Sequence, residues 1–547
     1  MSPNDPSGPP RTPPAPLNSP ADRHLAERVR DPGFTPRARD LDGLVDLLED
    51  DELEKHVERA IGRVSSGEAA LAALEARFRA ARPPTRARIV RAVGKLPASR
   101  GTVGFLLGAL RDDDPKARRN AAIELGHSRS PEVEEALLAA WTSDPRPEMR
   151  RTVAASLGKV GGKASLDLLR EARGAADSEL VRIAERSLLM VERTSSRGER
   201  GRIDPNRAPE RPVEVLLLSR RGLEDLIVGE IGDVPGLGGV RATGPGRVRA
   251  TLSEAPLATL FRSRVALSFR FPLATEWVNE HEGPADAVAR AVTGDTARAV
   301  FKTWTIGSPR YRIAWTEGHR RAATWEAARL IAEREPTLVN DPTASLWELD
   351  VETQRRFVDV AIAPRGLADP RFSWRVEDVP AASHPTVAAA LARVAGVRPD
   401  DVVWDPFVGA GAELVERALL GPYRSLEGTD VDTRALAHAR RNLDAAGLPA
   451  RLEHADALAR RPRGITLIIT NPPMGRRASR VQGLMEDLDR FVTHAASVLE
   501  AGGRLVWLAP WPARTRRAAE DAGLKLHWSR TVDMGGFDAE MQRWSKP

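Results

Sequence analysis

The most informative segment of the chain is Ile465-Thr-Leu-Ile-Ile-Thr-Asn-Pro-Pro-Met-Gly475. Its apolar, β-branched run has no polar alternation, which is typical of a buried parallel strand. Pro472 and Pro473 have no backbone N–H to donate to a neighbouring strand, so the strand ends there. Such a turn also fits an ordinary strand exit. In an open α/β sheet, however, the carboxyl ends of the strands are where ligands bind.

Three predicted strands precede this segment, and each is followed by an acidic residue at or just beyond its end. The strands with their following loops are Asp401-Val-Val-Trp404 with Asp405-Pro-Phe-Val-Gly-Ala-Gly411, Ser425-Leu-Glu-Gly-Thr-Asp430, and Ala450-Arg-Leu-Glu-His454 with Ala455-Asp-Ala457. A Gly-x-Gly turn between a strand and a helix lets the backbone approach a ligand closely. The acid at the end of the second strand, 19 residues beyond Gly411, suits a ribose diol.

These motifs, in this order, strongly resemble class I S-adenosylmethionine-dependent methyltransferases over residues 376–547. The resemblance is closest to THUMP-containing RNA methyltransferases that modify the exocyclic N2 amine of guanine in tRNA or ribosomal RNA. It implies a Rossmann-like α/β domain with a seven-stranded sheet. Gly502-Gly-Arg-Leu-Val-Trp-Leu508 is the predicted fifth strand, and the segments 524–530 and 537–544 are expected to form an antiparallel end of that sheet.

The resemblance also implies how the cofactor, S-adenosylmethionine, is held. The implied cofactor-binding residues are Asp405, Phe407, Gly409, Gly411, Asp430, Asp456 and Ala457. The glycine turn and its preceding acid would cradle the methionine part of the cofactor. The second acid would accept hydrogen bonds from the ribose hydroxyls, and the third from the adenine amine. Ala382-Ser-His-Pro385 resembles the segment that caps the cofactor.

The Asn-Pro-Pro-Met motif, with Asn471, Pro472, Pro473 and Met474, is the predicted catalytic segment. A base amine is a poor nucleophile because its lone pair is conjugated into the ring. Two acceptors aimed at its N–H groups favour a pyramidal nitrogen, and the Asn471 side chain and the Pro472 carbonyl are suited to this. The family usually has an aromatic residue where this chain has Met474, and Thr where it has Ala412. A thioether packs on a ring face with less orientation than an aromatic ring does.

Other functions remain open at this point. A cofactor-binding RNA-recognition or scaffold protein with weak or no catalysis also fits Met474 and the repeats described below. Asn-Pro-Pro serves adenine-N6 DNA methylation and protein glutamine methylation as well, although the middle of this chain argues against both. Arg476 and Arg477 follow the motif and suit either a substrate phosphate or a solvated loop.

Residues 213–375 resemble a small domain followed by a THUMP-like RNA-binding domain; we call the small one the leading domain. The resemblance lies in Arg221-Gly-Leu-Glu-Asp-Leu226, Gly246-Arg-Val248, Leu260-Phe-Arg-Ser-Arg264, strand 310–315, helix 322–333 and hairpin 346–362. Arginine and aromatic residues gather here, and they suit phosphates and unstacked bases. They are Trp304, Arg310, Tyr311, Arg312, Trp315, His319, Arg320 and Arg321. The alternative is that the aromatic residues fill the core and the arginines solvate its edge.

Residues 38–195 repeat with a fixed period. Gly62, Gly94, Gly126 and Gly158 are 32 residues apart, and Arg86, Arg118, Arg150 and Arg182 keep the same step. A fixed period with two helices per unit predicts an α-solenoid of HEAT-like repeats. We expect each glycine to end a helix with a positive φ. The arginines either line a face that binds acid or phosphate, or pair with the aspartates of the solenoid; a protein or RNA partner is expected there.

Composition limits the remaining possibilities. At 547 residues the chain is too long for one core. The formal net charge is +6, and nearly all the positive charge is carried by arginine. This composition fits either phosphate binding or a general preference for Arg over Lys. No cysteine is present, and we expect no metal site. The Pro-rich residues 1–36 are expected to be a disordered tail and 196–212 a linker. Without an apolar run of membrane-spanning length, we expect a cytoplasmic protein.

Overall fold

The computed structural model describes residues 20–128, 130–195, 201–278, 282–318, 320–379, 382–474 and 481–547. His319, Arg476 and Arg477, which the sequence singled out, lie outside these ranges. The chain forms two compact units. One comprises residues 1–200 with 328–340, and the other comprises residues 201–327 with 341–547.

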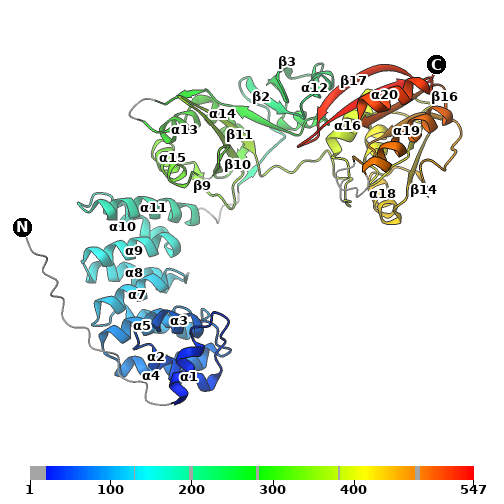
Figure 1. Ribbon diagram of the computed structural model, residues 1–547. Helices are drawn as coiled ribbons and strands as arrows, with labels where there is room; N and C mark the ends of the chain where they lie inside the picture. Colours follow the sequence, from blue (N-terminus) through cyan, green and yellow to red (C-terminus); the bar gives the residue numbers. More distant parts are fainter. Residues whose placement is uncertain are drawn as a thin grey trace, which may run out of the picture. The chain divides into compact units, whose positions relative to one another are not determined.

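The first unit is a stack of helices in two layers, which confirms the predicted α-solenoid (Figure 1). Helices α3, α5, α7, α9 and α11 pack in succession in one layer, and the even-numbered helices form the other. Their apolar faces build two hydrophobic clusters, one from α1 to α9 and a second that joins α9, α10 and α11. The helices are α1 (Pro20–Arg28), η1 (Ala38–Asp40), α2 (Leu41–Leu47), α3 (Glu54–Ile61), α4 (Gly67–Ala80), α5 (Pro83–Val93), α6 (Arg100–Ala109), α7 (Pro115–Leu125), α8 (Pro131–Ser143), α9 (Pro147–Val160), α10 (Lys163–Ala172) and α11 (Ser178–Ser195).

The repeated glycines have a different cause from the one predicted. Gly62, Gly94 and Gly126 follow the ends of α3, α5 and α7, but their φ angles are −62°, −63° and −61°, so no left-handed cap is present. Instead, the next helix of the layer packs directly on them. A Cβ added at Gly126 would lie 2.9 Å from Ser156 Oγ, and one at Gly158 would lie 2.9 Å from the Cα of Ser187. The period therefore marks close helix packing.

The N-terminal boundary of the solenoid also differs from the prediction, which placed residues 1–36 in a disordered tail. Residues 20–28 form α1, and Leu25, Val29 and Phe34 are buried in the solenoid core. The prediction is wrong for 20–36 because these few apolar residues, spaced four and five apart, suffice to cap the exposed end of a helix stack. Residues 1–19 lie outside the described ranges.

The predicted linker 196–212 is likewise ordered where it is described, from 201 onward. β1 (Arg202–Ile203) pairs with β7 (Thr305–Ile306), and the indole of Trp304 donates a hydrogen bond to the carbonyl of Arg207 at 2.9 Å. Ile203 is buried. The polar composition predicted a linker without regular structure, but backbone hydrogen bonds join residues 202–203 to the strand at 305–306.

The middle of the chain forms a nine-stranded sheet with the order β3-β4-β2-β5-β11-β10-β8-β9, in which β6 also pairs with β11. The predicted strand at 310–315, the helix at 322–333 and the hairpin at 346–362 are confirmed. The elements are β2 (Val213–Leu218), α12 (Glu224–Ile231), β3 (Leu237–Gly244), β4 (Arg247–Leu252), η3 (Leu257–Arg262), β5 (Ser268–Pro272), β6 (Glu276–Trp277), α13 (Pro284–Val292), α14 (Asp295–Trp304), β8 (Arg310–Trp315), α15 (Arg321–Arg334), β9 (Val339–Asn340), β10 (Trp347–Gln354) and β11 (Phe357–Pro364).

The C-terminal domain is a seven-stranded sheet with the order β14-β13-β12-β15-β16-β18-β17, flanked by helices (Figure 1). The first five strands are parallel and the last two run antiparallel to their neighbours, as predicted. The elements are α16 (Pro385–Ala395), β12 (Val402–Asp405), α17 (Ala412–Leu420), β13 (Ser425–Asp430), α18 (Thr433–Ala445), β14 (Arg451–His454), β15 (Ile465–Thr470), α19 (Val481–Val498), β16 (Leu499–Ala509), α20 (Pro512–Asp521), β17 (Lys525–Asp533) and β18 (Asp538–Ser545).

A buried ion pair fixes the leading domain to this C-terminal domain. Arg264 donates to both carboxylate oxygens of Glu416 on α17, at 2.6 and 2.8 Å, and to the carbonyl of Arg371 at 2.7 Å. The side chain of Glu416 is 1% exposed. The indole of Trp374 donates to the same carboxylate at 3.2 Å. The two domains therefore share a contact in which every oxygen of a buried carboxylate is satisfied.

Candidate active site

A cavity of about 1220 Å³ opens at the carboxyl ends of the parallel strands, where the sequence placed the four motifs. Asp430, Asp456, Ala457 and the segment 471–474 all line it, together with Phe407, Val408 and Gly409 of the glycine turn. These residues come together because β14, β13, β12 and β15 are parallel neighbours, so their loops leave the sheet at one edge.

The glycine turn depends on two left-handed residues. Gly409 has a φ of +49° and Gly411 a φ of +83°, which side chains other than glycine rarely adopt. The N–H of Gly409 donates to Asp430 Oδ2 at 3.0 Å, and the N–H of Val408 donates to the carbonyl of Thr429 at 2.9 Å. The turn is thus tied to the end of β13 and presents its backbone to the cavity.

Asp405 lies beneath this turn rather than on the cavity wall. Its Oδ1 accepts hydrogen bonds from the N–H of Phe407 at 3.1 Å and from Thr470 Oγ1 at 2.7 Å. Its Oδ2 is buried and has no hydrogen-bond partner among the described residues. Burial, reinforced by the nearby carboxylate of Glu413, raises the pKa of Asp405 well above its usual range. Asp405 thus ties the end of β15 to the glycine turn.

Asp430 is placed to accept hydrogen bonds from a ligand. Its two oxygens accept from the N–H groups of Gly409 and Asp432, at 3.0 and 2.9 Å, and each keeps a further lone pair. Val431 follows it and lines the cavity although its side chain is 68% exposed. Asp456 Oδ1 accepts from the N–H of Leu458 at 2.8 Å. Two carboxylates with an apolar side chain beside them suit a nucleoside.

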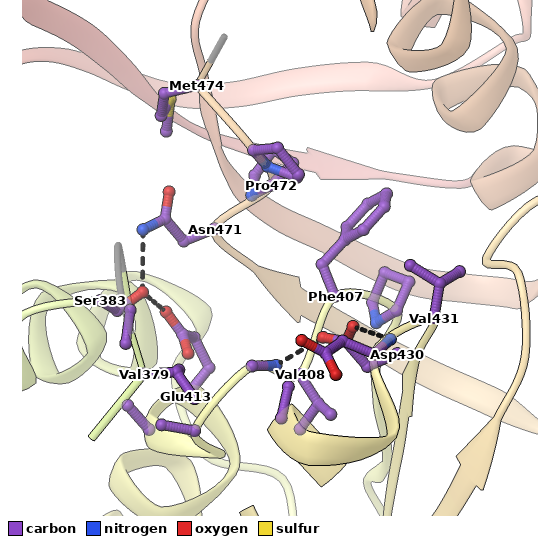
Figure 2. Close-up of a pocket in the computed structure, with 18 of the residues that line it drawn as sticks. Val379, Ser383, Phe407, Val408, Glu413, Asp430, Val431, Asn471, Pro472 and Met474 are labelled. Atoms are coloured by element: carbon purple, nitrogen blue, oxygen red, sulfur yellow. Dashed lines mark hydrogen bonds between the residues drawn. The ribbon is translucent and has the colours of Figure 1, made fainter. Parts of the chain in front are cut away.

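Asn471 projects from the end of β15, and its two amide atoms differ. Nδ2 donates to Ser383 Oγ at 2.8 Å, and Ser383 Oγ donates to Oε1 of Glu413 (Figure 2). Oδ1 is buried and accepts no hydrogen bond from any described residue. Since a buried acceptor without a donor is costly, this oxygen is a natural contact for a ligand amine. Ala382, Ser383 and His384 line the same cavity, as expected for a capping segment.

The outer wall of the cavity combines Met474 with residues from two other regions. Met534 and Phe537 come from the turn between β17 and β18, and Arg220 comes from the leading domain. Arg220 Nη1 donates to the carbonyl of Asp533 at 3.2 Å, which joins these two regions. Burial lowers the pKa of Arg220. An aromatic ring is therefore present at the cavity although the motif itself has Met474.

Sequence reasoning did not single out several of these residues. Glu413, Thr470 and Val431 lie within or beside the motifs, and Glu413 carried a usable signal because a carboxylate sits on the buried face of α17. Arg220, Met534 and Phe537 lie far from the motifs along the chain. No local pattern marks them, since only the fold brings them to the cavity.

In the middle domain, the predicted RNA-contact residues divide into core and surface. Trp304 and Tyr311 are fully buried, and Arg310 forms a buried ion pair with Asp341 at 3.0 Å. For these the core alternative holds. Arg320 stacks over Trp315 at 5.6 Å, and both are only partly buried, so they remain candidates.

The described part of the chain contains neither a cluster of metal-ligand residues nor a membrane-spanning helix. No group of three or more His, Cys, Asp or Glu residues there is arranged to hold a metal ion. Within the same residues, no helix is long and apolar enough to cross a membrane.

The residues at the cavity fit S-adenosylmethionine. Asp430 offers carboxylate acceptors for the ribose hydroxyls, and Asp456 offers them for an exocyclic amine. Val431, which directly follows Asp430, offers an apolar surface at the same cavity. The glycine turn presents backbone without a Cβ at Gly409, whereas Gly411 does not line the cavity and faces Ala439 of α18. A cavity of about 1220 Å³ also leaves space for a second molecule beside the cofactor.

Comparison with known proteins agrees with this site. The RMKL-like methyltransferase domain family matches residues 373–539, and HEAT repeats match residues 102–189. The tRNA (guanine(6)-N2)-methyltransferase of Thermus thermophilus is 31% identical over 341 residues, which cover 58% of this chain and 94% of that protein. The tRNA (guanine(10)-N2)-dimethyltransferase of Methanothermobacter thermautotrophicus is 33% identical over 134 residues, covering 24% of this chain and 39% of that protein.

Solved structures show the same fold. TrmN from Thermus thermophilus has a TM-score of 0.50 at 22% identity, covering 61% of this chain and 100% of that one. SMU.472, a putative methyltransferase complexed with S-adenosylhomocysteine, has a TM-score of 0.50 at 14% identity, covering 62% of this chain and 99% of that one. From the match to nearly the whole Thermus enzyme, this chain belongs to the S-adenosylmethionine-dependent guanine-N2 RNA methyltransferases.

Proposed function

We propose that this protein transfers a methyl group from S-adenosylmethionine to the N2 amine of guanosine 6 in tRNA. The observation that carries the proposal is the 31% identity over 94% of the Thermus thermophilus protein of that name. The Archaeoglobus fulgidus protein of the same name is 28% identical over 190 residues, covering 30% of this chain and 48% of that protein. A tRNA substrate also implies a cytoplasmic location.

The cofactor's sulfonium supplies an activated methyl group, so the protein mainly positions the reactants. Asp430 holds the ribose hydroxyls, and Asp456, with the Ala457 backbone, holds the adenine amine. The turn from Phe407 through Gly409 and Gly411 shapes the end of the cavity for the methionine part. Asp405, buried under that turn, keeps the turn and β15 in register through its bonds to Phe407 and Thr470.

Asn471 and Pro472 act on the substrate amine. Asn471 Oδ1, which lacks a donor among the described residues, accepts one N–H of the amine, and the carbonyl of Pro472 accepts the other. Pro472 and Pro473 hold that carbonyl at low entropic cost because their φ angles are fixed. Both acceptors favour the pyramidal nitrogen whose lone pair can attack, and they stabilise the positive charge that develops on it.

The guanine ring packs against Met474 and Phe537. A thioether and an aromatic ring at one cavity replace the single aromatic residue that usually follows Asn-Pro-Pro in this family. A guanine paired in a helix must leave its stack to reach the cavity. Phe537 of the β17–β18 turn thus compensates for the weaker packing expected from Met474 alone.

Surface residues of the middle domain provide further contacts to the tRNA, and the solenoid provides a surface for a partner. Arg320 and Trp315 suit an unpaired base or a phosphate in the tRNA. The solenoid has no counterpart in a relative that matches 58% of this chain, and we assign it to a protein or RNA partner.

Transcripts of one tRNA with guanosine or adenosine at position 6 test the proposal. With labelled cofactor, the guanosine transcript should give N2-methylguanosine and the adenosine transcript none. Label that persists in the adenosine transcript but disappears when guanosine 10 is replaced would assign the protein to the other position found among its relatives.

A further inference from the structure

The side-chain amide of Asn471 is held in one orientation by two residues from other elements. Nδ2 donates to Ser383 Oγ at 2.8 Å, and the Ser383 hydroxyl donates to Oε1 of Glu413 (Figure 2). A serine hydroxyl has one proton. Because the Ser383 hydroxyl donates this proton in its hydrogen bond to Glu413, Oγ presents only lone pairs to Asn471. The NH₂ group of Asn471 must therefore face Ser383 Oγ. Oδ1 is therefore the amide atom left for the substrate.

Both residues of this relay are themselves fixed. Glu413 is 3% exposed in the first turn of α17, and Arg375 Nη1 donates to the carbonyl of Ser383 at 2.7 Å. The charged groups that face Glu413 are Arg375, Asp405 and Glu416. Burial raises the pKa of Glu413 and Asp405, but hydrogen bonds to Glu413 and the charge of Arg375 favour its ionised form. The Ser383 hydroxyl donates to Oε1 of Glu413 and therefore does not donate to Asn471.

We propose that Ser383 and Glu413 are positioning residues that set the direction of Asn471 Oδ1 during methyl transfer. This inference rests on the proposed function. Without Glu413 the Ser383 hydroxyl is free to donate to Oδ1, and the amide turns over. Its NH₂ group then faces the substrate amine, which is also a donor, so the hydrogen bond that assists the attack no longer forms.

Four single variants and the double variant that combines Ser383→Ala with Glu413→Leu test this relay in the full-length protein. Ser383→Ala removes the link, Glu413→Leu removes the terminal acceptor, and Ser383→Thr keeps a hydroxyl. Ser165→Ala is the matched control, because Ser165 Oγ donates to Glu134 Oε1 at 2.7 Å within the solenoid and neither residue lines the cavity. The measurements are kcat and KM for tRNA, and the Kd of S-adenosylmethionine by calorimetry.

The relay predicts a loss confined to kcat. Ser383→Ala and Glu413→Leu should each lower kcat by about 10-fold to 100-fold, with KM and cofactor Kd within about twofold of the wild type. Ser383→Thr should recover most of the loss, and Ser165→Ala should match the wild type. Because both residues act through one atom, the double variant should be no slower than the slower single variant.

Three results would overturn the relay. These are wild-type kcat in Ser383→Ala, loss of cofactor affinity in step with kcat, and losses that multiply in the double variant. Failure of the proposed function has a separate signature, since the wild-type protein itself would then transfer no methyl group to guanine.

Discussion

The proposed chemistry depends on Asn471, and the surroundings of this residue explain why. Thr470 is bound to Asp405, and Asn471 is bound through Ser383 to Glu413, so the end of β15 is anchored by two buried carboxyl groups. Of the two amide atoms of Asn471, Nδ2 is bound to Ser383, and Oδ1 has no donor among the residues described. A rigid site whose acceptor is already in place favours the transition state because little reorganisation is needed.

Asn471→Ala removes this acceptor while leaving the cofactor contacts in place. We expect kcat to fall by about 10²-fold to 10³-fold, comparable with the loss of one group from an oxyanion hole. The Kd of S-adenosylmethionine should stay within a few-fold. Methyl transfer and calorimetry on the same preparation check both values. Loss of cofactor binding would show that Asn471 belongs to the cofactor site instead.

Among the elements, the solenoid glycines predicted the repeat correctly, but the predicted reason for these glycines was wrong. The step of 32 predicted the repeats, but a sequence does not distinguish a glycine needed for its φ from one needed for space. The same holds for Gly158, which lies inside α9 and touches Ser187 of α11. Close approach between helices depends on the neighbouring repeat and is not a local property.

Gly158→Ala should therefore destabilise the solenoid. The new methyl group would lie 2.5 Å from Ser187 Oγ and 2.9 Å from its Cα, so α9 and α11 must separate. We expect a loss of about 1–3 kcal/mol. Gly104→Ala is the control, because nothing lies within 4 Å of that position in α6 and the substitution should stabilise by about 0.5–1 kcal/mol. Thermal unfolding compares the two, and equal shifts would contradict the packing explanation.

The contact between the leading domain and α17 gives a prediction that depends on pH. Arg264→Met leaves the buried carboxyl of Glu416 without its cation, which we expect to cost about 3–5 kcal/mol. Burial already raises the pKa of Glu416. The variant raises it further, so the folded state holds its proton while the unfolded state ionises, and stability falls as pH rises above the unfolded value.

The measurement is chemical unfolding of the wild-type and Arg264→Met proteins at pH 5 and pH 8. The difference in unfolding free energy between them should be larger at pH 8. A difference that is independent of pH would show that Glu416 keeps its charge without Arg264.

For the whole molecule, the question is whether the arginines of the solenoid bind RNA phosphates or pair with acidic residues of the solenoid itself. Arg86 pairs with Asp112, and Arg118 binds Asp144 at 2.9 Å, so these two in-register arginines neutralise aspartates of the solenoid itself. Arg150 instead stacks over Trp141 at 5.2 Å. Paired arginines release few counterions when a nucleic acid approaches. These interactions favour the structural alternative over phosphate binding.

Arg118→Gln should consequently lower stability without changing the salt dependence of tRNA binding. If Arg118 instead bound a phosphate of the RNA, its removal would reduce the slope of log K against log salt by about 0.7 to 0.9. The affinity for tRNA, measured at several salt concentrations, should give parallel lines for wild type and variant. A shallower line for Arg118→Gln would place RNA on the solenoid.

The sequence predicted what local patterns encode. The strand that stops at Pro472, the glycine turn and the acid at Asp430 are each set by neighbouring residues, and their order specifies the sheet. The relay from Ser383, 88 residues before Asn471, and the wall formed by Arg220 and Phe537 are set by long-range contacts. No periodicity records those contacts, so only the folded chain reveals them.

We propose that Asn471 and its neighbours activate an exocyclic guanine amine in RNA. The most direct test is to incubate the protein with labelled S-adenosylmethionine and unmodified tRNA, digest the RNA, and identify the labelled nucleoside. We expect N2-methylguanosine from the wild-type protein and background label from Asn471→Ala. Label in another nucleoside, in DNA or in protein, or equal N2-methylguanosine from both proteins, would contradict it.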